Sequence, residues 1–74
     1  MMIRAELLRR LEDARARAER AHLDIVVHGH EADKLKMAGR DSSESYRRMK
    51  DAENAEQKHL REMRWILDQL DELK

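Results

Sequence analysis

Apolar residues recur along the first half of the chain with the spacing of a long helix. From Leu7 to Leu35 they are separated alternately by four and three residues, and only His28 interrupts their apolar character. The stripe consists of Leu7, Leu11, Ala14, Ala18, Ala21, Ile25, His28, Ala32 and Leu35. Because this spacing keeps one side of an α-helix apolar, the pattern predicts a helix over about residues 2–38.

A short β-branched run interrupts this half of the chain. Ile25, Val26 and Val27 are followed by His28 and Gly29, which is a local pattern typical of a strand. No second strand-like run exists to pair with it, and a lone strand would leave its backbone groups unpaired. We therefore expect the helix to continue, and we place any kink at Gly29, which costs about 1 kcal/mol relative to Ala in a helix.

The second half of the chain has a stripe of its own, which is apolar except at Glu56 and His59. It consists of Met49, Ala52, Glu56, His59, Met63, Ile66, Leu70 and Leu73, again alternating by three and four residues. Tyr46, Leu60 and Leu67 form an adjacent stripe, so the apolar face is wider than that of a two-stranded coiled coil. The pattern predicts a second helix over about residues 42–74.

The residues between the two stripes carry a helix stop followed at once by a helix start. Gly39 suits the left-handed conformation that closes a helix. Asp41 or Ser42 can cap the next helix, and Glu44 follows Asp41 at the spacing of a capping box. We therefore expect an all-α antiparallel helical hairpin, a single domain over residues 1–74 with its turn at 39–41.

Folding such a hairpin about residues 40–41 predicts which side chains meet. The expected pairs are Leu35 with Tyr46, Ala32 with Met49, Ala21 with Leu60, Ala18 with Met63, Ala14 with Leu67 and Leu11 with Leu70. Small residues of the first helix then oppose large residues of the second, which allows close packing without voids.

Several apolar residues remain outside this intrachain seam. They are Leu8, Leu23, Val26, Val27, Leu60 and Leu67. Since the seam is rich in alanine and buries little area, we predict a homodimer in which two hairpins form a four-helix bundle, with residues 23–27 in the second interface. Trp65 is either a further interface anchor or a half-exposed ring stacked on Arg61.

The charges of the chain suggest one alternative function. Arg9, Arg10, Arg17 and Arg20 could contact phosphate, which would make the chain a small nucleic-acid-binding regulator built as a helical-hairpin dimer. Acidic residues interleave with these arginines, however, and the 16 basic and 16 acidic residues give a net charge of zero. A nucleic-acid-binding domain is usually basic, so a solvated, salt-bridged surface is the favoured interpretation.

The histidines suggest a third function, a metal-binding helical bundle. Folding brings His28 toward Glu53, with Glu56 about one turn away and His59 on the same stripe as Glu56. His28 and His30 point about 200° apart on a helix and cannot share an ion. A polar layer of His28 with Glu53 or Glu56 is therefore favoured over a metal site, and we expect no cofactor.

The remaining features narrow the class of function. The chain has no cysteine, no catalytic motif and no glycine-rich phosphate loop. It also lacks a run of about 18 apolar residues and the apolar core of a signal peptide, so we expect no membrane contact and a cytoplasmic location. The expected function is a non-enzymatic protein–protein interaction or assembly module that acts through helix packing, with itself or another helical protein as partner.

Overall fold

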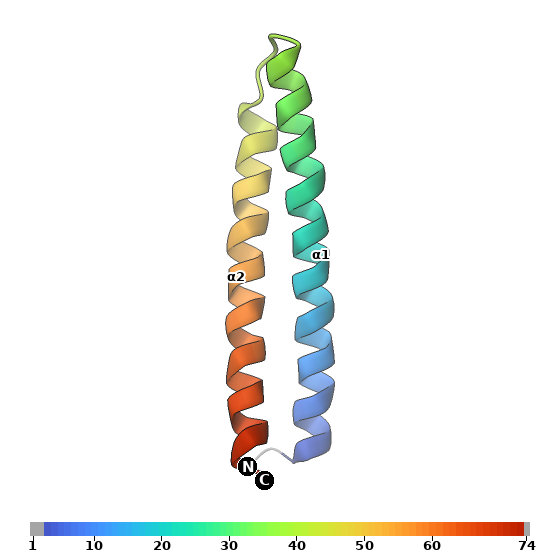
Figure 1. Cartoon of the computed structure of the whole chain (residues 1–74), viewed down its shortest axis with the longest axis vertical. Helices are drawn as coiled ribbons and strands as arrows, with labels where there is room; N and C mark the ends of the chain where they lie inside the picture. The colour runs from blue at the N-terminus through green and yellow to red at the C-terminus, as the bar shows by residue number, and fades with distance from the viewer. Residues whose placement is uncertain (1–2, 74) are drawn as a thin grey trace.

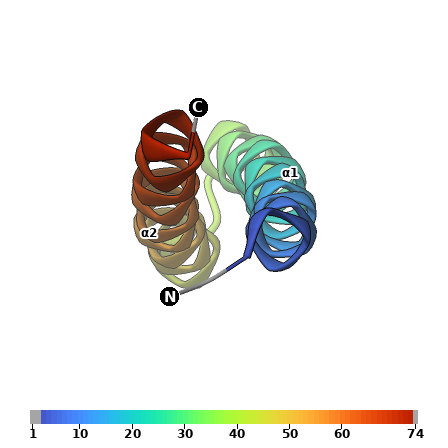
Figure 2. The ribbon, with the colours of Figure 1, turned by 90° about the horizontal axis from the view of Figure 1, so that it is seen from below.

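The computed structural model describes residues 3–73, which form two antiparallel α-helices (Figure 1). Helix α1 spans Arg4–Met37 and runs through Gly29 without a break, and helix α2 spans Ser43–Glu72. The Cα atoms fill a rod of 56 × 14 × 13 Å. Viewed along this rod, the described residues form a single pair of helices with two uncovered sides (Figure 2). The all-α hairpin expected from the sequence is confirmed.

The two helices meet along the predicted seam. The buried residues are Leu7, Ala14, Ala18, Ala21 and Ala32 in α1 and Ser45, Ala52 and Ile66 in α2. Leu7 and Ile66 are the only large side chains among the described residues that are fully buried, and with Ala14 they form a cluster near the open end of the hairpin. Because most of the other buried residues are alanines, the helices approach closely but bury little apolar area.

The pairing of the helices differs from the predicted register by about one turn. Met49 was expected opposite Ala32. Its Sδ atom instead lies beside Gly29, 3.2 Å from the position that a Cβ atom on this glycine would occupy. Glu56 was expected about one turn from His28, but its Oε2 atom lies 3.0 Å from His22 Nδ1. Figure 1 shows the reason: α1 rises to the tip of the hairpin, and residues 38–42 run back down before α2 begins. The predicted pairs were placed symmetrically about residues 40–41 and did not allow for this path of the connector.

Gly39 ends α1 in the predicted way. Its φ is +70°, in the left-handed region, and its N–H donates to the carbonyl oxygen of Lys36 at 3.1 Å. The N–H of Arg40 donates to the carbonyl oxygen of Leu35 at 2.8 Å. These two bonds form a Schellman motif, which satisfies carbonyl groups that the end of the helix would otherwise leave free.

Asp41 precedes the N-cap residue Ser42 and accepts from the first N–H of α2, but the predicted capping box is replaced by ion pairs. Asp41 Oδ1 accepts hydrogen bonds from the Ser43 hydroxyl at 2.6 Å and from the Ser43 N–H at 3.0 Å. The Glu44 carboxylate turns to Arg47 and Arg48, with its Oε1 2.7 Å from Arg47 Nη2 and 3.2 Å from Arg48 Nε. Two guanidinium groups within reach offer Glu44 charge-assisted bonds in place of the single backbone N–H of a capping box.

Replacing each of the two glycines with alanine should change the free energy of unfolding in opposite directions. Gly39→Ala forces a Cβ into the left-handed region, and we expect the free energy of unfolding to fall by about 1 kcal/mol. Gly29→Ala is the matched control, because helix propensity favours alanine there by up to about 1 kcal/mol. The close contact is with the flexible end of Met49, which can shift. Urea unfolding at one protein concentration measures both, and equal destabilisation would contradict the assigned turn.

Ser43→Ala should raise the pKa of Asp41. The hydrogen bond from the Ser43 hydroxyl, followed by the bond from its N–H, holds the pKa of Asp41 below its ordinary value of 3.8. A lowered pKa contributes stability that is present above pH 3.8 and is lost as the pH falls through the folded-state value. An NMR titration of the Asp41 carboxyl measures the shift. Ser42→Ala, whose hydroxyl caps no N–H, should leave this titration unchanged.

Candidate protein interaction surface

An open groove lined by apolar side chains runs along one side of the hairpin. It consists of two neighbouring hollows of about 550 and 480 Å³, whose linings share Arg15 and Met63. The lining residues are Leu8, Leu11, Glu12, Arg15, Ala18, Glu19, His22 and Leu23 from α1 and Glu56, Leu60, Met63 and Leu67 from α2. We call this surface the leucine groove.

Four leucines give this groove its apolar character. Leu8, Leu23, Leu60 and Leu67 are 43%, 59%, 42% and 51% exposed. Leu8 and Leu67 directly follow the buried Leu7 and Ile66, so each is turned by about 100° from the seam and toward solvent. The structure thus brings together four of the residues that the sequence placed outside the intrachain seam.

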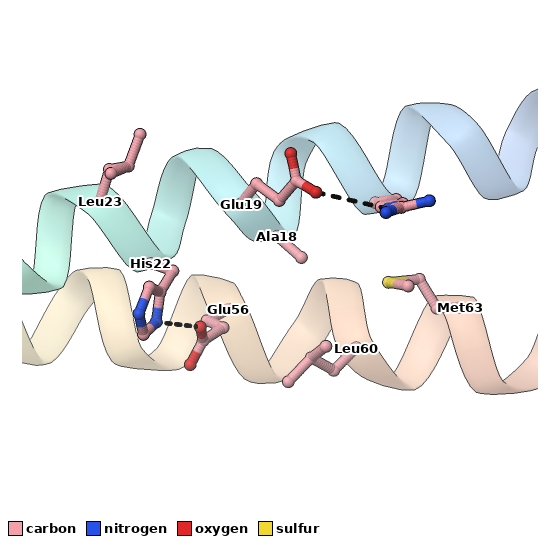
Figure 3. A pocket seen from close by; sticks show the side chains of 8 residues that line it. Ala18, Glu19, His22, Leu23, Glu56, Leu60 and Met63 are labelled. Atoms are coloured by element: carbon pink, nitrogen blue, oxygen red, sulfur yellow. Dashed lines mark hydrogen bonds and ion pairs between the residues drawn. The ribbon is translucent and has the colours of Figure 1, made fainter.

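Polar and charged side chains lie beside Leu23 and Leu60 (Figure 3). His22 reaches across the groove, and its Nδ1 lies 3.0 Å from Glu56 Oε2. Arg15 Nε lies 3.3 Å from Glu19 Oε1 along α1. An apolar floor with a polar rim has the anatomy of a protein–protein interface. Sequence reasoning missed His22, because the predicted register placed Glu56 nearer to His28.

Trp65 lies outside the leucine groove, in contact with a residue of the other helix. The guanidinium carbon of Arg10 is 5.5 Å from the centre of the Trp65 ring, and Arg10 Nη2 is 3.6 Å from Glu62 Oε1. The expected stacking on a cation is therefore present, but the cation is Arg10 of α1 and not Arg61. The antiparallel pairing brings this arginine to the ring, which spacing within α2 alone could not show.

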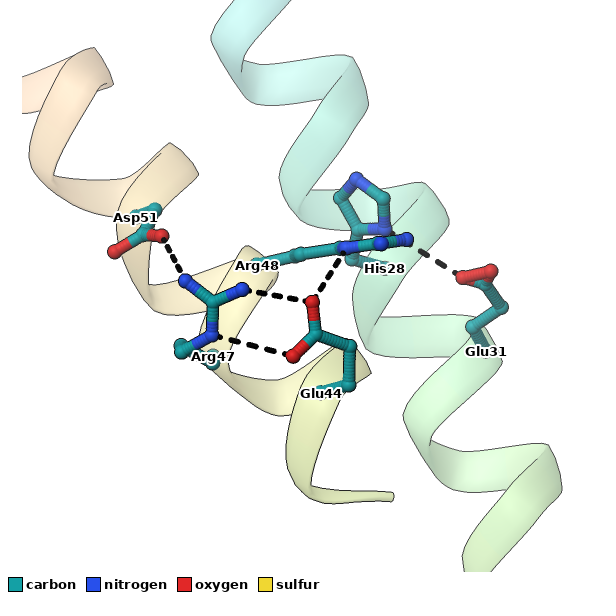
Figure 4. Close-up of polar contacts among 6 residues, drawn as sticks. All are labelled: His28, Glu31, Glu44, Arg47, Arg48 and Asp51. Carbon is teal, nitrogen blue, oxygen red and sulfur yellow. Dashed lines mark hydrogen bonds and ion pairs between the residues drawn. The ribbon is translucent and has the colours of Figure 1, made fainter. Parts of the chain in front are cut away.

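His28 also pairs differently from the prediction. Its Nδ1 lies 3.5 Å from Glu31 Oε2 on the same helix (Figure 4). The predicted layer of His28 with Glu53 or Glu56 is wrong, because Glu53 pairs with Lys50 of its own helix and Glu56 with His22. The register shift of one turn explains this difference, since it moves both carboxylates toward earlier residues of α1.

The metal candidates are not brought together. Within residues 3–73, no three side chains from His, Cys, Asp and Glu are placed to hold one ion. The Nδ1 atoms of His28 and His59 are buried and make no hydrogen bond, so the 3.5 Å approach of Glu31 to His28 is a contact without hydrogen-bond geometry. Glu56 is engaged by His22 across the groove. The geometry of the described residues therefore offers no support for the metal-binding interpretation.

Two of the four candidate phosphate-binding arginines are engaged by carboxylates. Arg10 contacts Glu62, and Arg20 Nε lies 4.0 Å from Asp24 Oδ1. Near the hairpin tip, Arg47 is held between Glu44 and Asp51 (Figure 4). The acidic residues that interleave with the basic residues in the sequence thus lie beside them in the structure. This pairing does not favour the nucleic-acid interpretation.

In the described part of the chain, neither helix contains a stretch apolar enough to cross a bilayer. Comparison with known proteins finds no matching protein family, no matching curated protein and no matching solved structure.

Proposed function

We propose that this chain is a non-enzymatic assembly module whose leucine groove packs against a second copy to complete a four-helix bundle. The observation that carries the proposal is the gathering of Leu8, Leu23, Leu60 and Leu67 on one side of a hairpin that has few large side chains in its core. Apolar side chains aligned between two helices fit the ridges of another helix pair.

The exposed area of the hairpin supports one further interface. Its accessible surface is 6027 Å², whereas a compact monomer of 8.8 kDa exposes about 4,800 Å². Its radius of gyration of 16.7 Å also exceeds the value of about 11 Å typical of a compact domain of this length. A standard protein interface covers about 800 Å² per partner. One such interface along the groove would remove most of the excess.

The energetic need for this interface follows from the composition of the core. Full burial of a leucine contributes about 1.5–3 kcal/mol, so covering four half-exposed leucines would contribute roughly 3–6 kcal/mol per chain. The seam has five buried alanines and two buried large apolar residues. The free energy gained by covering the four leucines is therefore large compared with the free energy gained by apolar burial within one hairpin. Assembly and folding should therefore be coupled.

Two adjacent valines provide a matched test. Val26 and Val27 are both 56% exposed, so aspartate at either position meets a similar environment in an isolated hairpin. Val26 is 18 residues, or five full turns, from Leu8, which places it on the groove side, whereas Val27 is turned about 100° further. We therefore leave Val27 out of the proposed interface, although the sequence analysis assigned all of residues 23–27 to it. We expect Val26→Asp to dissociate the dimer in sedimentation experiments at about 100 µM and Val27→Asp to leave it intact.

The result is informative in either direction. A wild-type chain that sediments at 8.8 kDa would contradict self-assembly. A dimer that tolerates Val26→Asp but is lost in Val27→Asp would place the interface on another side of α1. Circular dichroism of each variant separates loss of assembly from loss of helix, since a variant that stays helical but monomeric has lost only the interface.

A further inference from the structure

Six residues of α1 at or beside the leucine groove form one stripe with a symmetric spacing. The stripe consists of Leu8, Glu12, Arg15, Glu19, His22 and Val26, separated by four, three, four, three and four residues. Its first five members line the groove. Reversing the direction of α1 leaves this spacing unchanged, and the midpoint of the stripe lies between Arg15 and Glu19.

The chemistry of the stripe is complementary to its own reversed copy. When α1 is laid antiparallel on a second α1 about this midpoint, Leu8 faces Val26 of the second copy. Glu12 then faces His22 of the second copy, and Arg15 faces its Glu19. Every acid meets a basic side chain and the two apolar ends meet each other, which is the self-complementarity that a two-fold interface requires.

The position of Leu60 in α2 agrees with the same axis. Leu60 lies across from Ala18 in Figure 3, and Ala18 is next to the midpoint of the stripe. A two-fold axis at this level carries Leu60 onto Leu60 of the second copy. The centre of the contact between the two α2 helices is then apolar, while Arg15 and Glu19 provide the charges beside it.

We infer that two copies pair antiparallel through the leucine groove, with their hairpin tips at opposite ends and the two-fold axis between Arg15 and Glu19. This inference rests on the proposed assembly function and adds its orientation. The Arg15–Glu19 pair, 3.3 Å apart within one chain, joins the same pair of the second copy in a cluster of four alternating charges. The opposite orientation, with both tips at one end, would place α1 on the α2 of the second copy and leave this complementarity unused.

Introduced cysteines can report the orientation, because the chain has no cysteine of its own. Leu60→Cys should give mostly disulfide-linked dimer on oxidation with diamide, since the two sulfurs meet at the axis. A mixture of Leu8→Cys and Val26→Cys chains should also cross-link. Leu8→Cys alone should not, because its two copies lie about 27 Å apart in this arrangement.

A mixture of Leu8→Cys and Leu67→Cys chains tests the opposite orientation, in which these two positions face each other. If this mixture cross-links and Leu60→Cys does not, while the wild-type chain sediments as a dimer, the inferred orientation is wrong and the assembly proposal stands. If the wild-type chain sediments as a monomer, both the assembly proposal and the inferred orientation are wrong. Cross-linking of Leu60→Cys and of the Leu8→Cys and Val26→Cys mixture, with the Leu8→Cys and Leu67→Cys mixture at background, confirms the orientation.

Discussion

The close contact of two alanine-rich helices is the constraint on which the rest of this structure depends. Five of the eight buried residues of the two helices are alanines, and Ala14, Ala18 and Ala21 follow one another along α1. Small side chains let the helices approach each other, but they leave little apolar area to offset the entropy lost on ordering two long helices. The larger apolar residues are displaced to the edge of the seam, where they line the leucine groove.

The turn converts this contact into a defined register. Gly39 terminates α1, and Asp41 accepts a hydrogen bond from the first N–H of α2. The connecting residues run back from the tip of the hairpin before α2 begins (Figure 1). This path sets which side chains meet further along the hairpin, including the pairing of His22 with Glu56 and the position of Met49 beside Gly29. A change in the length of the connector would therefore alter contacts along the whole rod.

The sequence was sufficient to predict those features that depend on local spacing. The alternation of three and four residues predicted the seam, and Gly39 predicted the end of α1. The path of the connector is not encoded in any repeat, so the predicted pairs were displaced by one turn and His28 was assigned the wrong carboxylate. The cation on Trp65 was missed for a related reason, since Arg10 reaches the ring only after the helices have paired.

The central claim is that the leucine groove is covered by a second copy of the chain. The most direct measurement is the melting temperature of the wild-type chain across a hundredfold dilution. Assembly coupled to folding changes the free energy of unfolding by about 2.7 kcal/mol over this range, so we expect the melting temperature to fall by several degrees on dilution. A melting temperature that stays constant across the dilution would contradict the account.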